Sequence, residues 1–268
     1  MKFAILSLSG GLDSTSLLLH ILAQQTYDKV YTYSFKYGQN HSMEIKLAQK
    51  TVKLLNKLLH RSEDNLIKHD VIELSSIFKD CGSSLTSGSN LIPKGQDYNE
   101  TNQQSTVIPI RNVIFASILY SKASGLVTNF QKLNNDDVTL HQDSVRPSVS
   151  VDIFTGVHSN DNAVYPDCRP ESVQMAQQLF KLSDYNGESI NYKTPFVNFS
   201  KSEVLNDGIA SLKNLGLSKQ FNQIYKNTIT CYAPNEKGES CGECASCKDR
   251  LEAFENNGIK DPIKYCNQ

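Results

Sequence analysis

The chain has 268 residues, of which 39% are hydrophobic and 21% charged, and a formal net charge of -1. This length is sufficient for a full hydrophobic core, in one domain or in one domain with an appendage. The balanced charge argues against a nucleic-acid surface and favours chemistry on small molecules. The apolar run near the N-terminus is too short for a signal peptide or a membrane span, so we expect a cytoplasmic protein.

The chain opens with an apolar run at residues 3–6, followed by the loop 9–15, whose sequence is SGGLDST, and by a second apolar run at 17–19. This order predicts a strand, a tight turn and the start of a helix. Glycines let the backbone approach a phosphate closely, and the amides of a helix N-terminus favour an anion. The hydroxyls of the loop can donate further hydrogen bonds, and Asp13 can hold Mg²⁺ beside phosphate oxygens. An ordinary strand-to-helix turn capped by Ser or Asp would show the same sequence pattern.

The loop sequence resembles the SGGxDS signature of the PP-loop ATP pyrophosphatases. Such enzymes hold the β,γ-pyrophosphate of ATP and transfer AMP to a substrate oxygen. The loop differs from the Walker pattern, because no Gly-Lys-Ser/Thr follows the turn. The resemblance implies an α/β fold with a parallel, doubly wound, Rossmann-like sheet.

The next segments alternate between strand and helix patterns. Residues 30–35 are β-branched and aromatic in alternation and predict a second strand, which ends in the loop 36–41. Residues 43–59 have the periodicity of a helix, and 70–74 form a plausible third strand. The polar stretch 81–106 is either an active-site lid or a disordered connection, and we favour the lid.

The middle of the chain is harder to interpret. Arg111 opens a predicted helix over 113–123, where it either faces an anionic group or lies in solvent. Asparagines and aspartates in 127–149 suggest turns. A core strand is expected at 149–157, and the loop 158–170 beyond it carries charged and aromatic side chains suited to recognition.

The last third predicts a helix at 172–182, a strand at 190–195 and a capping box at 200–203 that begins another helix. Lys201, in that capping box, either reaches ATP phosphates or is exposed to solvent. Four cysteines crowd near the C-terminus, with glycines between them, which in a cytosolic protein favours a metal over disulfides. They can surround one structural Zn²⁺, with an iron–sulfur cluster as the alternative; they are Cys231, Cys241, Cys244 and Cys247.

Six motifs in order, spread over residues 3 to about 260, resemble the QueC family of 7-cyano-7-deazaguanine synthases: SGGLDST, FKYGQNH, IPIRN, GVHSNDNAVYPDCRPE, TPF with a following SKSE, and TCY…CGECASC. The resemblance implies an ATP-dependent ligase that adenylates 7-carboxy-7-deazaguanine. Ammonia then displaces AMP to give the amide, and a second adenylation permits elimination to the nitrile. It also implies Mg²⁺, Zn²⁺ at the four cysteines, and a homodimer.

The resemblance also suggests residue roles. The segment that binds ATP in the family corresponds here to Leu8, Ser9, Gly10, Gly11, Leu12, Asp13, Ser14, Thr15, Ser16, Leu17 and Leu18. The other roles are hypotheses from position and chemistry, and by these Phe35, Tyr37 and Gln39 would border the nucleotide. We expect Arg111 to neutralise developing charge and Lys201 to reach phosphate. The deazaguanine or ammonia would meet Asp161, Tyr165, Asp167 and Arg169. Cys168 is interpreted as a packing residue, because adenylation already activates the carboxylate.

Several positions depart from the family pattern. Lys36 stands where an acidic residue is usual, Ile110 replaces a glycine, and Val164 replaces a glycine before YPDC. Residues 127–149 resemble an insertion within a nucleotide-binding domain at 1–200, which is followed by a helical, zinc-binding region at 201–268. The alternatives are a QueC-like ligase that stops at the amide or joins another amine, and a zinc-bearing binding module without catalysis.

Overall fold

The computed structural model describes residues 1–268 except 41–42, 80, 87–100, 136–147 and 267–268. In the described part of the chain, five strands form a sheet in which every pairing is parallel, in the order β3-β2-β1-β4-β5. The strands are β1 (Lys2–Ser7), β2 (Lys29–Lys36), β3 (Lys68–Glu73), β4 (Ser150–Phe154) and β5 (Ile190–Lys193). The predicted doubly wound parallel sheet is therefore confirmed.

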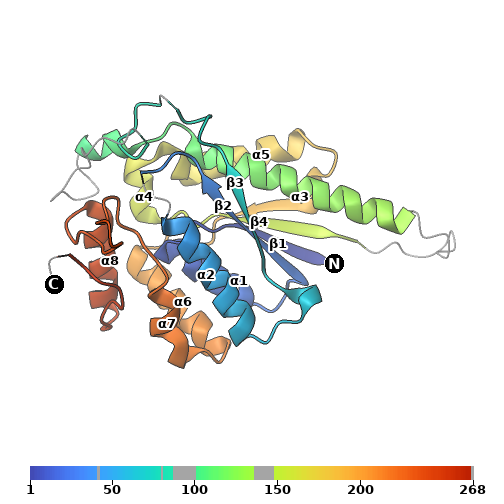
Figure 1. Cartoon of the computed structure of the whole chain (residues 1–268). Coiled ribbons are helices and arrows are strands. Elements are labelled where there is room, and N and C mark those ends of the chain that lie inside the picture. Colours follow the sequence, from blue (N-terminus) through green and yellow to red (C-terminus); the bar gives the residue numbers. More distant parts are fainter. Residues whose placement is uncertain (41–42, 80, 87–100, 136–147, 267–268) are drawn as a thin grey trace.

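Helices cover both faces of the sheet, with α1, α2 and α6 on one side and α3 and α5 on the other (Figure 1). The α-helices are α1 (Leu12–Ala23), α2 (Met43–Leu58), α3 (Arg111–Asn135), α4 (Ser159–Val164), α5 (Pro170–Leu182), α6 (Lys201–Asn214), α7 (Phe221–Tyr225) and α8 (Ala245–Asn256). Short 3₁₀ turns lie at Glu63–Asn65, Thr101–Thr106, Pro166–Cys168, Gly187–Ser189 and Ser218–Gln220.

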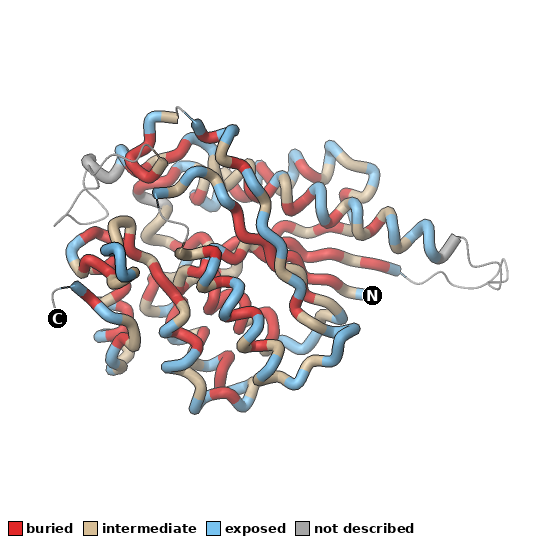
Figure 2. The backbone as a smooth tube through the Cα atoms, in the orientation of Figure 1, coloured by how far each residue is buried: buried red, intermediate tan, exposed pale blue. Residues whose placement is uncertain are grey.

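The alternation of β1 explains why both faces need cover. Ala4 and Leu6 pack into the cluster that contains α1 and α6, while Phe3 and Ile5 pack into the cluster that contains α3 and α5. Strands buried on both faces read as continuous apolar runs, as the N-terminal run does. Figure 2 shows the central strands as the most buried part of the chain.

The strand order fixes where a ligand can bind. The chain moves outward from β1 to β2 and β3, then returns to the other side of β1 for β4 and β5. The connections therefore diverge at the carboxyl ends of β1 and β4, and this topological switch point opens a crevice. The loop 9–15 follows β1, and residues 155–158 follow β4, so both border it.

The C-terminal segment shares a core with the N-terminal helices. Ala253 and Phe254 of α8 belong to the same buried cluster as side chains of α1 and α6. Arg250 is fully buried, and its Nε lies 2.6 Å from Asp261 Oδ2. A buried, charge-assisted pair of this kind fixes the final turn of the chain against α8.

Helix α3 corrects the expected turns. It runs unbroken to Asn135, because Ala123, Val127 and Phe130 continue its apolar stripe onto the sheet, and Asn129 lies exposed on the other side. Packing of that stripe outweighs the turn preference of asparagine. By length and composition alone the segment 104–133 could span a membrane, yet its inner face packs as a core helix. Residues 136–147, and most of the expected lid at 87–100, lie outside the described residues.

Candidate active site

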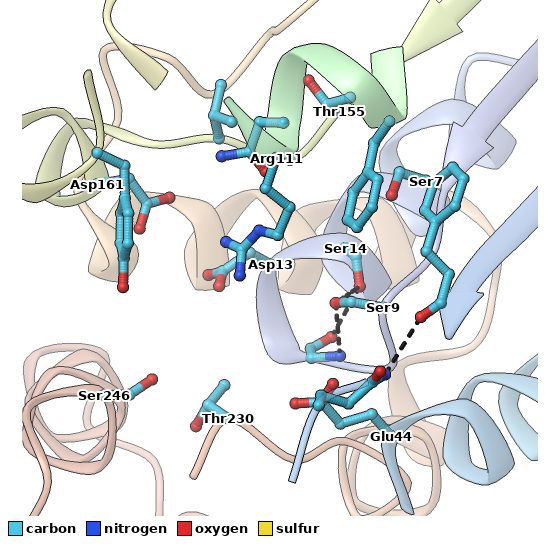
Figure 3. A pocket seen from close by; sticks show the side chains of 18 of the residues that line it. Ser7, Ser9, Asp13, Ser14, Glu44, Arg111, Thr155, Asp161, Thr230 and Ser246 are labelled. Carbon is cyan, nitrogen blue, oxygen red and sulfur yellow. Dashed lines mark hydrogen bonds between the residues drawn. The ribbon is translucent and has the colours of Figure 1, made fainter. Parts of the chain in front are cut away.

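A cavity of about 230 Å³ occupies the switch point. The loop 9–15 borders it after β1, and Phe35 and Tyr37 border it at the end of β2 and just beyond it. His158 borders it beyond β4. Figure 3 shows Ser9, Asp13 and Ser14 of the loop with Arg111 of α3 around this space. The C-terminal segment closes it with Thr230, Tyr232 and Ser246. Residues far apart in the sequence thus meet in one space, as is usual for ligand sites in open α/β sheets.

The loop 9–15 has the geometry of an anion cradle. Gly10 has φ +88°, and a Cβ built there would lie 2.2 Å from the backbone oxygen of Glu44, so only glycine fits against the start of α2. Ser9 Oγ accepts a hydrogen bond from the Gly11 amide at 3.2 Å and lies 3.0 Å from Ser14 Oγ. Amides, hydroxyls and the N-terminus of α1 therefore face the cavity together.

Other members of the expected ATP segment face the protein interior. Ser16 Oγ bonds to the buried Tyr225 hydroxyl at 2.8 Å, away from the cavity. Thr15 is also fully buried, and its Oγ1 has no hydrogen-bond partner among the described residues. The four leucines of the segment have fully buried core side chains, namely Leu8, Leu12, Leu17 and Leu18. The family segment therefore mixes ligand-facing positions with packing positions, and these side chains serve packing.

Asp13 and Lys201 lie close together at the N-terminus of α1. Lys201 is 3% exposed, which excludes the solvent-facing alternative, and its Nζ lies 2.8 Å from Asp249 Oδ2 and 3.6 Å from Asp13 Oδ2. Asn160 Nδ2 donates to Asp249 Oδ1 at 2.6 Å. A buried ammonium held between carboxylates is positioned rather than mobile, and such a group suits a phosphate oxygen. Asp13 Oδ1 is buried without a hydrogen-bond partner among the described residues.

Arg111 is part of the cavity wall and not a surface arginine. Its guanidinium carbon lies 5.5 Å from the ring centre of Tyr37 and 5.8 Å from that of Tyr165. The two rings hold the guanidinium by cation–π contact. The adjacent Asn112 amide donates to Asp167 Oδ2 at 2.8 Å, so Asp167 caps α3 and fixes its first turn.

The expected residues of the loop 158–170 separate into two groups. Asp161 and Tyr165 line the cavity, whereas Asp167 acts from behind it and Arg169 is exposed at the start of α5. Cys168 lines the cavity as a buried thiol, and Asn112 Nδ2 donates to its sulfur at 3.0 Å. Burial, together with Asp161 and Asp167, raises the pKa of this thiol far above its usual range, so Cys168 is neutral and unsuited to nucleophilic attack.

The end of β2 presents an aromatic wall. Phe35 stacks on Phe115 with ring centres 4.0 Å apart and planes 10° apart. Gln39 folds back on the same turn, since its Oε1 accepts from the Tyr37 amide at 2.8 Å and its Nε2 donates to the Phe35 carbonyl at 3.2 Å. Gln39 therefore stabilises the wall that a flat ligand would stack against.

The four predicted cysteines form one compact cluster. Their sulfur atoms lie within 4.8 Å of one another, and all four residues are buried. Cys241 Sγ and Cys247 Sγ are 3.9 Å apart, close to the separation of about 3.8 Å that a tetrahedral ion with 2.3 Å bonds requires. Backbone amides donate to the sulfurs of Cys231 and Cys241, as they do around metal-bound thiolates. The donor set fits Zn²⁺.

Comparison with known proteins agrees with this geometry. The family model described as "Queuosine biosynthesis protein QueC" matches residues 3–144 and 146–258. The chain belongs to the QueC family. A 7-cyano-7-deazaguanine synthase from Pseudoalteromonas translucida is 34% identical over 96% of this chain and 95% of its own length. The synthases of Caldicellulosiruptor saccharolyticus and Rickettsia conorii are also 34% identical, each over 98% of this chain and over 95% and 99% of their own lengths.

A structural comparison adds little to this. An NMN synthetase from Francisella tularensis matches at TM-score 0.34 and 10% identity, over 96% of this chain and 77% of that protein, which is too low to bear on function.

The departures from the QueC pattern have structural explanations. Lys36 is exposed and pairs with Glu73 at 2.8 Å, outside the cavity. Val164 packs in a small cluster with Val157 and Tyr165 behind the site. Ile110 has φ +49°, the left-handed conformation that a glycine adopts without strain. These substitutions leave the set of cavity-lining polar groups intact.

Several residues of the site were not predicted from the sequence, among them His158, Glu44 and Asp249. His158 is 1% exposed, and its Nε2 lies 3.5 Å from Asp161 and 3.8 Å from Asp13. Glu44 lines the cavity from the first turn of α2, whereas Asp249 of α8 does not line it and acts through its ion pair with Lys201. The signal that could have found Glu44 is its place one short loop beyond a parallel strand. Nothing local in the sequence marks Asp249.

Proposed function

We propose that this QueC-family chain is an ATP-dependent ligase that converts 7-carboxy-7-deazaguanine and ammonia to 7-cyano-7-deazaguanine, with release of AMP and pyrophosphate. Curated relatives of matching length carry that name. The observation that supports it most is the convergence of Asp13, Lys201 and Arg111 on one cavity beside the anion cradle. A negatively charged substrate with a poor leaving group needs the positive charges of Lys201 and Arg111, and of a cation held by Asp13, near the oxygens that gain charge.

The proposed chemistry begins at the substrate carboxylate. One of its oxygens attacks the α-phosphorus of ATP, and pyrophosphate leaves. The loop 9–15 and Lys201 would hold the β,γ-phosphates, because their donors face the cavity. Asp13 would bind Mg²⁺ through the buried, partnerless Oδ1, and the ion when bound neutralises phosphate charge. Arg111, held between two tyrosine rings, would stabilise the charge that develops at the adenylated carboxyl group.

The other side chains would orient the ring systems. The Phe35 and Tyr37 wall suits the adenine, and Gln39 keeps that wall in place. Asp161 and Tyr165 would meet the deazaguanine or ammonia at the opposite wall. Ammonia then displaces AMP to form the amide, and a second adenylation at the amide oxygen allows elimination to the nitrile.

One incubation tests the proposal. The protein is mixed with 7-carboxy-7-deazaguanine, ATP, Mg²⁺ and ammonium, and the product mass and pyrophosphate are measured. We expect the nitrile and two AMP per product. Asp13→Ala should abolish pyrophosphate release with zinc content unchanged, while the exposed Asp64→Ala should behave as wild type. Wild-type turnover by Asp13→Ala would refute the loop's role.

The same measurement separates the alternatives. An amide or conjugate mass with one AMP per product would identify a QueC-like ligase with a different end point. No pyrophosphate with any candidate acid would instead favour a zinc-bearing binding module. We further propose a structural Zn²⁺, a homodimer and a cytoplasmic location, the first tested by metal analysis and the second by sedimentation.

A further inference from the structure

The Glu44 side chain lines the cavity, but the proposed adenylation chemistry assigns it no role. It belongs to the first turn of α2, and Figure 3 shows it below the Ser9 and Ser14 pair, with Asp13 and Arg111 on the other side. Its carboxylate has no hydrogen bond or ion pair to any described residue, although the side chain faces the site. A carboxylate facing a cavity without a partner implies a ligand that donates a proton or a hydrogen bond.

The position of Glu44 is fixed by the loop that holds phosphate. The Glu44 backbone oxygen packs against Gly10 so tightly that a Cβ at Gly10 would collide with it. The groups that act electrostatically on its carboxyl are Arg111 from α3 and Tyr37 from the end of β2. Glu44 thus lines the same cavity as the phosphate cradle, within electrostatic reach of Arg111, and the acyl adenylate is expected to form in that cavity.

The reaction has a step that requires a proton acceptor at this place. Attack by ammonia on the acyl adenylate forms a C–N bond while the C–O bond to AMP breaks, and the electron pair leaves on the phosphate of AMP. The nitrogen must then lose one N–H proton to become an amide. In the second stage, attack of the amide oxygen on ATP leaves a nitrogen that carries two protons. One is lost to give the neutral imidate, and the other is lost as the C–O bond to AMP breaks and the C≡N bond forms.

We infer that the Glu44 carboxylate accepts these nitrogen protons, one in amide formation and two in nitrile formation, releasing each to solvent before it accepts the next, and so is a catalytic residue of the steps that follow each adenylation. This inference rests on the proposed function. Burial raises the pKa of Glu44 to about 7, partly offset by Arg111, so the group can both take up a proton and release it to solvent near neutral pH. Asp161 stays with the opposite wall, where it caps α4 through the His158 amide at 3.4 Å.

The test separates adenylation from C–N bond formation. Wild type and Glu44→Gln are compared by pyrophosphate release with ATP, Mg²⁺ and the acid but no ammonium, and then by amide and nitrile formation after ammonium is added. In Glu44→Gln we expect the rate of pyrophosphate release without ammonium to change less than about threefold. The rate of amide and nitrile formation should fall by about 10²–10⁴-fold. Glu44→Asp should keep an intermediate rate, and formate added to Glu44→Ala should recover part of it.

Control variants make each outcome decisive. Glu188→Gln, at a side chain 92% exposed, should match wild type in both assays. Equal loss of both half-reactions in Glu44→Gln and Glu44→Asp, or unchanged amide formation in a folded Glu44→Gln, would overturn the inference. A raised KM for the deazaguanine acid alone would also overturn it, because Glu44 would then recognise the ring and take no proton. Failure of wild type to release pyrophosphate would refute the proposed function itself.

Discussion

Ile110 allows a direct test of how the chain enters α3. It has φ +49°, in the left-handed region where a β-branched side chain is strained. Its carbonyl accepts from the Ile114 amide at 3.0 Å, so the residue sets the first turn that brings Arg111 into the cavity. The side chain itself is 61% exposed. The perturbation is a pair of variants, Ile110→Gly and Ile110→Ala, which both remove it.

The comparison of the two variants isolates the backbone. A Cβ in the left-handed region costs about 1–2 kcal/mol, while glycine loses about 0.5–1 kcal/mol more than alanine in conformational freedom on folding. The difference predicts that Ile110→Gly is more stable than Ile110→Ala by about 0.5–1 kcal/mol. At about 2–4 °C per kcal/mol for a chain near this size, the Tm values should differ by roughly 1–4 °C.

Urea unfolding of both variants measures this difference. The control pair is Leu182→Gly and Leu182→Ala, at a side chain 88% exposed on α5, where alanine should be the more stable. The order must therefore reverse between the two sites. Alanine at least as stable as glycine at position 110 would show that the turn relaxes and that the strain argument is wrong. Activity should be retained in both position 110 variants, because the side chain lies outside the cavity.

Three other variants test the remaining parts of the site. Cys244→Ser should lose zinc and melt at a lower temperature; a well-folded, zinc-free protein would contradict the structural role. Asp249→Asn should raise the KM for ATP roughly tenfold with kcat and zinc content little changed, because Lys201 loses its closest carboxylate; equal KM values would remove Asp249 from the site. Glu44→Gln should be more stable than wild type at pH 8 by about 1–2 kcal/mol but not at pH 4, measured by urea unfolding. The folded pKa of Glu44, about 7, lies above its ordinary 4.5, so wild type loses stability as pH rises through 7 and the amide does not; an equal difference at both pH values would refute the burial argument.

Much of the fold could be predicted because its signals are local. The apolar run and the glycine turn predict β1 and α1, and the spacing of the four cysteines predicts their cluster. The end of α3 could not be predicted in this way. Its asparagines favour turns locally, but contacts with the sheet, such as that of Phe130 with Phe3, decide the helix.

The site shows the same division. The loop 9–15 is recognisable from its residues alone, whereas the burial of Lys201 is not. A lysine in the first turn of a helix is usually exposed. Here Asp249, which is far away in sequence and on another helix, compensates its charge. Ion pairs of that kind depend on tertiary packing, and the sequence around either partner contains no pattern that predicts them.

Helix α8 begins directly after Cys244 and contains Cys247, and it carries Ser246, which lines the cavity, and Asp249, which pairs with Lys201. The four-cysteine cluster is therefore continuous with one wall of the cavity. A newly made chain that has not acquired its ion would lack that wall and the partner of Lys201. Metal binding and completion of the cavity would then be coupled through α8.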